Sequence, residues 1–121
     1  MKTIFGVSAA AAAMLIASAQ YAAAAPANQY PTVDRIEYVH ACQRDHADRP
    51  AQEMLYKCSC VIDTIADKLN YDEYVESSTA FYASSIAGER GQVIRTEVNT
   101  KHLADTFKSI QANARKACFV N

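Results

Sequence analysis

The stretch MLYKCSCVIDTIADKL, residues 54–69, decides the fold, because it has the clearest periodicity in the chain and carries two of the four cysteines. Its apolar residues recur three and four positions apart, as on one face of an α-helix, whereas Lys57, Asp63 and Lys68 fall on the other face. The apolar face consists of Met54, Leu55, Cys58, Val61, Ile62, Ile65 and Leu69. This pattern predicts an amphipathic helix at the centre of an all-α fold.

The cysteines of this helix indicate how it is linked to the rest of the chain. Cys58 and Cys60 are two residues apart, so about 200° of rotation separates their side chains, which argues against a bond between them. Each therefore needs Cys42 or Cys118 as its partner. In an antiparallel hairpin turning at residues 47–49, Cys42 lies a little over one turn before the connection, and Cys58 is the nearer to it of the two cysteines on the central helix. This geometry favours Cys42–Cys58 with Cys60–Cys118 over the exchanged pairing.

The start of the chain resembles a secretory signal. Lys2 supplies a positive charge, and residues 4–16 form an apolar run that is too short and too rich in alanine for a membrane span. Small residues follow, so we expect cleavage after Ala24, with cleavage after Ala19 as the alternative. An even number of cysteines in a small exported chain is typical of a disulfide framework.

We therefore divide the chain into three segments: a signal peptide over residues 1–24, a flexible tail over 25–31 and a disulfide-linked helical domain over 32–121. Loss of the signal removes Lys2 alone among the charged residues and changes the formal charge from −1 to −2. A near-neutral chain without a basic stripe predicts no nucleic-acid partner, and no later segment is apolar enough to span a membrane. We expect a periplasmic or secreted protein that is a monomer or a small homo-oligomer.

Three further helices complete the expected four-helix bundle. The first helix is expected over residues 33–46, with Thr32 as its N-cap. Asp48 and Pro50 mark the start of the central helix. The apolar stripe of the first helix consists of Val33, Ile36, Val39 and Cys42.

The second half of the bundle is punctuated by caps and glycines. Asn70 and Glu73 have the spacing of a capping box at the start of the third helix, and Gly88 is its expected C-cap. Gly88 to Gly91 then form a turn, residues 92–96 an irregular connector, and residues 99–118 the last helix. Its expected buried seam is Leu103, Phe107, Ile110, Ala114 and Ala117.

The sequence has no arrangement typical of an enzyme. Asp72, Glu73 and Glu76 cluster at a helix start, where the helix dipole alone favours acidic residues. The serines lie outside any Gly-x-Ser-x-Gly context, and there is no glycine-rich phosphate loop. We therefore expect a non-catalytic protein without a resident cofactor or metal.

Surface residues instead suggest contact with another protein. The chain has seven tyrosines, whose apolar ring and polar tip suit protein-binding faces as well as the rim of a small core. The Gly-Glu-Arg-Gly turn presents two charged residues. The candidate interaction residues are Tyr56, Tyr74, Tyr82, Glu89 and Arg90. They predict a protein partner whose identity the sequence does not give.

A copper(I) site is the alternative. The Cys58-Ser59-Cys60 motif offers two soft sulfur ligands, and His40, His46 and Met54 are plausible helpers nearby. This reading requires free thiols, whereas the disulfide reading requires none.

Four short runs carry a resemblance. They are Cys58-Ser59-Cys60-Val61-Ile62-Asp63, Tyr71-Asp72-Glu73-Tyr74-Val75, Gly88-Glu89-Arg90-Gly91 and Ala117-Cys118-Phe119. Together they resemble small exported bacterial proteins of uncharacterised function that are associated with quinoprotein alcohol-oxidation systems. The resemblance covers nearly all of the mature chain and implies no catalytic residue.

The positions of the cysteines also resemble those of periplasmic immunity proteins of the Tai type, which are small, helical and disulfide-linked. This chain has Cys58-Ser59-Cys60-Val61-Ile62 where that family has Cys-x-Gly-Tyr-Ile. In size and compartment it is also similar to the small periplasmic chaperones of acid stress. An immunity-type inhibitor and an acid-stress chaperone are therefore further alternatives for its function.

Overall fold

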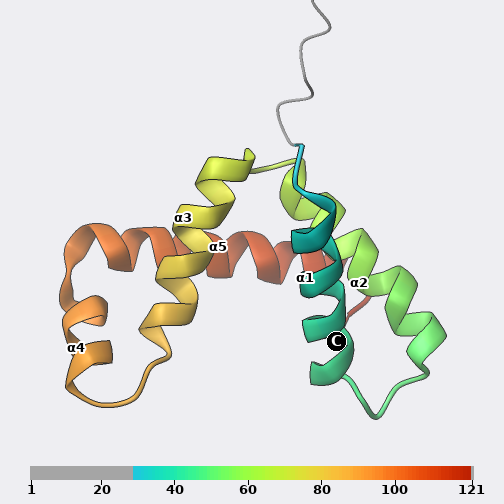
Figure 1. Cartoon of the computed structure of the whole chain (residues 1–121), viewed down its shortest axis with the longest axis horizontal. Helices are drawn as coiled ribbons and strands as arrows, with labels where there is room; N and C mark the ends of the chain where they lie inside the picture. The colour runs from blue at the N-terminus through green and yellow to red at the C-terminus, as the bar shows by residue number, and fades with distance from the viewer. Residues whose placement is uncertain (1–28, 121) are drawn as a thin grey trace, which may run out of the picture.

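The computed structural model of the protein describes residues 29–120, which form five α-helices and no strand (Figure 1). The helices are α1 (Thr32–Asp45), α2 (Ala51–Ala66), α3 (Tyr71–Ser84), α4 (Glu89–Thr96) and α5 (Val98–Ala117). The all-α class is confirmed. The expected signal peptide and the first residues of the expected tail lie outside the described residues.

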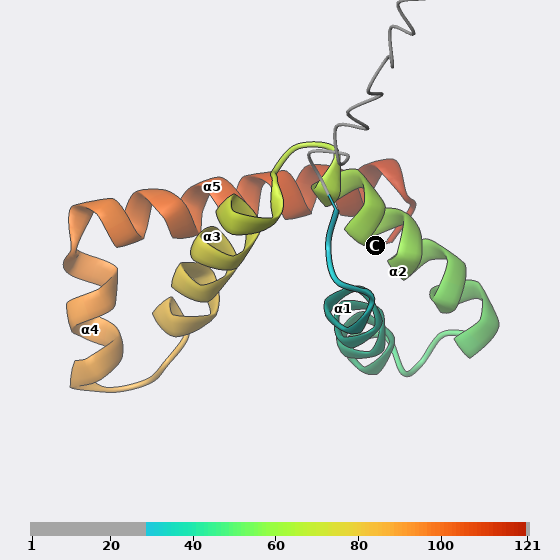
Figure 2. The same ribbon diagram turned by 45° about the horizontal axis from the view of Figure 1, so that its top comes forward.

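The long helix α5 runs through the whole assembly (Figures 1 and 2). Helices α1 and α2 form a hairpin at its C-terminal end, where α2 packs against both α1 and α5. Helix α3 packs across α5, and α4 packs against α3 and α5 at the other end. Among the described residues, no helix is long and apolar enough to cross a membrane.

The core is centred on the predicted amphipathic helix. Cys58, Val61 and Ile65 of α2 have no exposed surface, and Phe107 of α5 is equally buried. Leu55, which we had placed on the buried face, is 39% exposed. The apolar stripe of α1 is also narrower than expected, because Val33 and Ile36 are 58% and 49% exposed.

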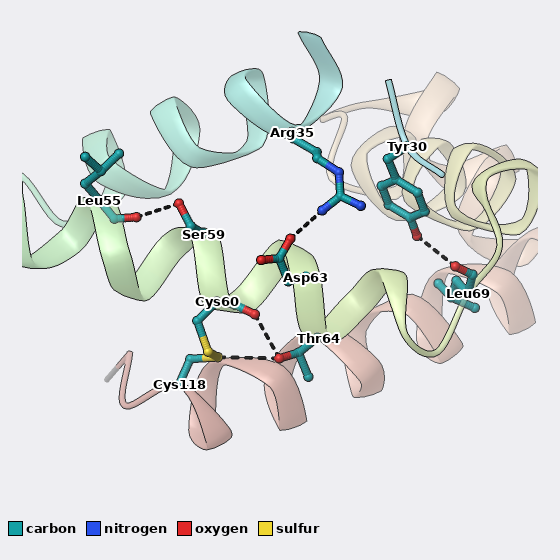
Figure 3. A network of polar contacts seen from close by, with 9 residues as sticks. All are labelled: Tyr30, Arg35, Leu55, Ser59, Cys60, Asp63, Thr64, Leu69 and Cys118. Atoms are coloured by element: carbon teal, nitrogen blue, oxygen red, sulfur yellow. Dashed lines mark hydrogen bonds and ion pairs between the residues drawn. A yellow bond between two sulfur atoms is a disulfide. The ribbon is translucent and has the colours of Figure 1, made fainter. Parts of the chain in front are cut away.

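Two disulfides join the helices, Cys42 to Cys58 and Cys60 to Cys118. These are the pairs that the hairpin geometry favoured. Cys58 is completely buried, while Cys60 lies on the exposed side of α2 and reaches the end of α5 (Figure 3). The hydroxyl of Thr64 donates to the carbonyl of Cys60 at 2.8 Å, one turn further along α2. Helix α2 is thus covalently tied to a neighbour on each of two sides.

The four-helix count was wrong because residues 89–96 form α4 instead of a turn and an irregular connector. Gly88 is the N-cap of α4, with a φ of 82°, and not the C-cap of α3, which ends four residues earlier. A Cβ at Gly91 would come within 1.7 Å of the carbonyl oxygen of Ile86, so only glycine allows this close approach. The guanidinium of Arg95 donates to the carbonyls of Ser84 and Ile86, both at 2.9 Å, and satisfies the end of α3.

Of the helix starts expected from the sequence, that of α3 is confirmed, whereas the N-caps of α1 and α2 differ from those expected. The capping box at α3 is confirmed: the Asn70 side chain accepts from the Glu73 backbone at 3.0 Å, and the Glu73 side chain accepts from the Asn70 backbone at 2.9 Å. Thr32 is the first residue of α1 instead of its cap, and α2 is preceded by Pro50 as its N-cap instead of Asp48. In α5, Ala117 is exposed, and the buried face includes Gln111.

Tyr30 shows that the expected tail does not extend to the start of α1. Its side chain is only 4% exposed, and its hydroxyl donates to the carbonyl of Leu69 at 3.1 Å (Figure 3). The guanidinium of Arg35 lies 5.4 Å from the centre of its ring and also pairs with Asp63 of α2. Tyr30 therefore joins the start of α1 to the end of α2.

Candidate functional site

A groove of about 680 Å³ lies between α1 and α3. The two helices sit on the same side of α5 and begin at the same end of the molecule (Figures 1 and 2). Four tyrosines line the groove, one from α1 and three from α3, namely Tyr38, Tyr71, Tyr74 and Tyr82. We call this surface the tyrosine groove.

Phe107 of α5 supports the aromatic side of the groove from beneath. Its ring centre lies 5.9 Å from that of Tyr74 and 6.3 Å from that of Tyr82, in tilted contacts typical of aromatic pairs. On the α1 side, the amide of Gln111 donates to the Tyr38 hydroxyl at 3.1 Å. Because Phe107 and Gln111 both belong to α5, one helix positions the tyrosines of both walls.

The closed end of the groove is held by a second aromatic cluster. The Tyr71 hydroxyl donates to the Asp34 carboxylate at 2.5 Å and thereby links the first turn of α3 to that of α1. Tyr30 packs against Tyr71 and Tyr74, with ring centres 5.6 Å and 4.7 Å away. These contacts fix the spacing of the two walls where both helices begin.

The tyrosines are neutral in the physiological pH range. Burial raises the pKa values of Tyr38, Tyr74 and Tyr82 above the ordinary phenol value. The hydrogen bond to the Asp34 carboxylate raises the pKa of Tyr71. The groove therefore presents aromatic faces with protonated hydroxyls and no phenolate.

Charged residues line the two ends of the groove with opposite sign. Asp34 and Glu37 lie in the first half of α1, beside the closed end, whereas His40 and Arg44 follow toward its C-terminus. Small side chains, among them Ala41 and Thr79, also line the groove. The groove is thus polarised along its length and can distinguish the two directions of a bound segment.

The candidate residues taken from the sequence are not all brought together. Tyr74 and Tyr82 line the groove. Tyr56 is 70% exposed on α2 and does not line it, and Glu89 and Arg90 lie in the first turn of α4. The Gly-Glu-Arg-Gly motif has a structural explanation in the cap and close packing of α4.

The candidate interaction residues predicted from the sequence did not include Tyr38 and Tyr71, although the residue spacing on both helices indicates them. Tyr71, Tyr74, Ser78 and Tyr82 recur at three- and four-residue spacing, as does a stripe of polar residues on α1. Such spacing indicates that each helix has a polar face, but it does not indicate what that face lies against. That the two faces meet across α5 depends on tertiary packing.

The sulfur atoms are not free to bind copper in this structure. All four cysteines are in disulfides. His40 is exposed and His46 half-buried, and the described residues contain no group of three or more His, Cys, Asp or Glu side chains that could hold a metal ion. The two cysteines of the Cys-x-Cys motif instead link α2 to Cys42 and to Cys118 through disulfides.

Comparison with protein-family models, with curated proteins and with solved structures gave no match for this chain.

Proposed function

We propose that this protein is an exported, non-catalytic protein-binding module whose tyrosine groove holds a segment of a partner protein. The observation that carries the proposal is the convergence of four tyrosines from α1 and α3 on one open groove. Tyrosine combines a large rigid contact area with a hydrogen-bonding tip, and it is enriched among the residues that dominate binding energy. The charges at the ends of the groove give such a contact a direction.

The dimensions of the groove suit a peptide segment. The stretch from Asp34 to Arg44 spans roughly 15 Å along α1, at 1.5 Å per residue, which matches about three turns of a partner helix. Small residues at Ala41 and Thr79 leave room in the groove. The helix-in-groove mode of recognition, in which an amphipathic helix lays one face between two others, fits these features.

The disulfides support the exported location that the proposal includes. Two disulfides within about one hundred residues are typical of proteins that fold in an oxidising compartment. The leader-like residues at the start of the chain agree with export. We therefore propose that the protein functions in the periplasm or outside the cell.

The experiment is capture of the partner with a groove-blocked variant as the comparison. Thr79 is exposed and lines the groove, so Thr79→Arg fills the groove without removing a core side chain. Ser109→Arg adds the same charge at an exposed position of α5 outside the groove and serves as the matched control. The oxidised protein should recover a defined exported protein, and Thr79→Arg should recover at least about tenfold less of it than Ser109→Arg does. Equal recovery by both variants, or no partner with the wild-type protein, would refute the proposal.

A further inference from the structure

A second pocket, of about 460 Å³, lies at the connection between α1 and α2. Two arginines and two histidines line it, namely His40, Arg44, His46 and Arg49. Its remaining lining consists of Gln43, Met54 and two alanines, so no carboxylate faces it. In a chain with a formal charge of −1, such a cluster does not follow from an overall excess of basic residues. We call it the hairpin pocket.

The arginines of the hairpin pocket take no part in the ion pairs that link residues 29–120. Elsewhere in the described part of the chain, cations such as Lys57, Lys101 and Arg115 each lie within 4.0 Å of a carboxylate. Arg44 and Arg49 are exposed and form no ion pair with any residue from 29 to 120. Glu53 is close enough for Arg49 to lower its pKa, but its carboxylate is bonded to Lys57 at 2.6 Å.

The backbone of the connection is well held, so the pocket has a defined shape. Gln43 donates from its side chain to the carbonyl of Ala51 at 3.1 Å, and the Arg49 amide donates to the carbonyl of His46 at 3.0 Å. Within this frame, Nε2 of His46 is buried and has no hydrogen-bond partner among residues 29–120. A buried nitrogen without a partner is a group that an incoming ligand can satisfy.

The hairpin pocket lies next to the tyrosine groove. His40 and Arg44 line both, so the pocket adjoins the positive end of the groove. Guanidinium groups bind carboxylates through charge-assisted hydrogen bonds, two at once, and the N–H group of an imidazole also donates to a carboxylate. The opposite end, with Asp34 and Glu37, repels negative charge.

We infer that the hairpin pocket binds the carboxylates of an acidic peptide segment, whose neighbouring residues occupy the tyrosine groove. This inference rests on the proposed function and adds to it the chemistry and direction of the partner. The acidic end of the segment lies over Arg44 and Arg49, and its uncharged or basic end lies beside Asp34. A peptide is favoured over a small anion because the pocket shares His40 and Arg44 with an adjacent aromatic groove of peptide length.

The test is selection of binders from a displayed library of random 16-residue peptides on the oxidised protein. We expect the selected peptides to be enriched in Asp and Glu near one end. Their affinity should fall about tenfold on Arg44→Gln/Arg49→Gln, since two charge-assisted contacts are lost. Lys108→Gln removes an exposed charge on α5 away from both sites and should leave the affinity unchanged. Both arginines are exposed, so their substitution leaves the core intact.

The outcomes separate this inference from the proposed function. Peptides that lose affinity on Thr79→Arg, but lack acidic enrichment or keep their affinity on the arginine variant, would overturn the inference and support the groove. Failure to select any peptide would overturn both. Displacement of the selected peptides from the wild-type protein by inorganic phosphate, at concentrations where sodium chloride of equal ionic strength has no effect, would identify a small-anion site and also overturn the inference.

Discussion

The two ends of the molecule are held together by different means. The linked half, which we define as α1, α2 and the C-terminal end of α5 at Cys118, contains both disulfides. The unlinked half, consisting of α3, α4 and the first part of α5, contains no cysteine. In the linked half, β-branched side chains such as Val61, Ile62 and Ile65 fill the core. In the unlinked half, small residues allow α3 and α5 to approach closely, and aromatic rings fill the remaining space.

Helix α4 in the unlinked half is held differently from α2 in the linked half. Around α4, the side chains of Ile86, Val93 and Val98 are 48%, 68% and 81% exposed. Burial of apolar surface therefore contributes little to the position of α4. Specific backbone contacts, made by Gly91 and Arg95, hold it instead.

The tyrosine groove lies on the boundary between the halves. Its α1 wall belongs to the linked half and its α3 wall to the unlinked half. One wall is thus covalently fixed, and the other is positioned by packing on Phe107 and by the Tyr71–Asp34 hydrogen bond. The shape of the groove therefore depends on the less constrained half.

The largest expected effect comes from removal of the aromatic centre of the unlinked half. Phe107→Ala should lower the free energy of unfolding by about 4–5 kcal/mol, because a completely buried ring that contacts three other rings is lost. Urea unfolding measures the loss. In Phe107→Ala, amide hydrogen exchange should accelerate more in α3 than in α2. In Ile65→Ala, the control in the linked half, the exchange of α3 relative to α2 should stay as in the wild type. A loss below about 1 kcal/mol would show that Phe107 does not organise this half.

Removal of the longer disulfide is expected to rank next. Cys60 and Cys118 are separated by 58 residues, so Cys60→Ala/Cys118→Ala should reduce stability by about 4 kcal/mol in the chain-entropy model. Cys42→Ala/Cys58→Ala opens a link of only 16 residues, for which the same model gives about 3 kcal/mol. Guanidinium unfolding of the two double variants compares them directly. Equal stability of wild type and the first double variant would contradict the role given to this link.

The position of α4 is tested by its glycines, with a smaller effect. Gly91→Ala should cost about 2 kcal/mol, because the new methyl group meets the carbonyl of Ile86 and displaces the helix. Gly88→Ala, where a Cβ meets nothing within 4 Å, should cost about 1 kcal/mol for the positive φ of 82° in an extended conformation, which is at the low end for this region. Thermal unfolding monitored by circular dichroism ranks the two. The reverse ranking would mean that α4 is not held by the close approach at Gly91.

The smallest effect concerns Tyr30, which joins α1 to α2. Burial raises the pKa of its hydroxyl to about 12 from an ordinary value of 10. The protonated form is thus favoured in the folded state, and its contribution is fully present below pH 10 and is lost as the pH rises from 10 to about 12. At pH 8, Tyr30→Phe should cost about 1 kcal/mol for the bond to Leu69.

That difference should shrink as the pH rises through 10, because the phenylalanine variant has no proton to lose at this position. Melting temperatures of both proteins between pH 8 and 11.5 provide the measurement. A difference that stays constant over this range would contradict the burial assigned to the Tyr30 hydroxyl.

The features that the sequence predicted depend on local spacing. The apolar period of residues 54–69 predicted α2, and the two-residue separation of Cys58 and Cys60 predicted links to different neighbours. The capping box at Asn70 is local as well. Each of these requires knowledge of only one helix or one turn.

The features that the sequence did not predict depend on contacts between distant segments. Helix α4 contains Gly91 and has no buried apolar face, so neither helix propensity nor apolar periodicity predicts it. The need for glycine at residue 91 follows only from its contact with the carbonyl of Ile86. The tyrosine groove requires α1 and α3 to meet across α5. Tyr38 and Gln111, 73 residues apart, are joined only by that packing.

The most direct test of binding in the groove is a map of amide chemical shifts. The isotope-labelled, oxidised protein would be titrated with its captured partner or with a selected peptide, and the shifts assigned along residues 29–120. We predict that the largest changes occur at Tyr38, Ala41, Tyr74, Ser78 and Tyr82, the two walls of the groove. Largest changes at Tyr56, or at Glu89 and Arg90 in α4, would contradict the assignment of binding to the space between α1 and α3.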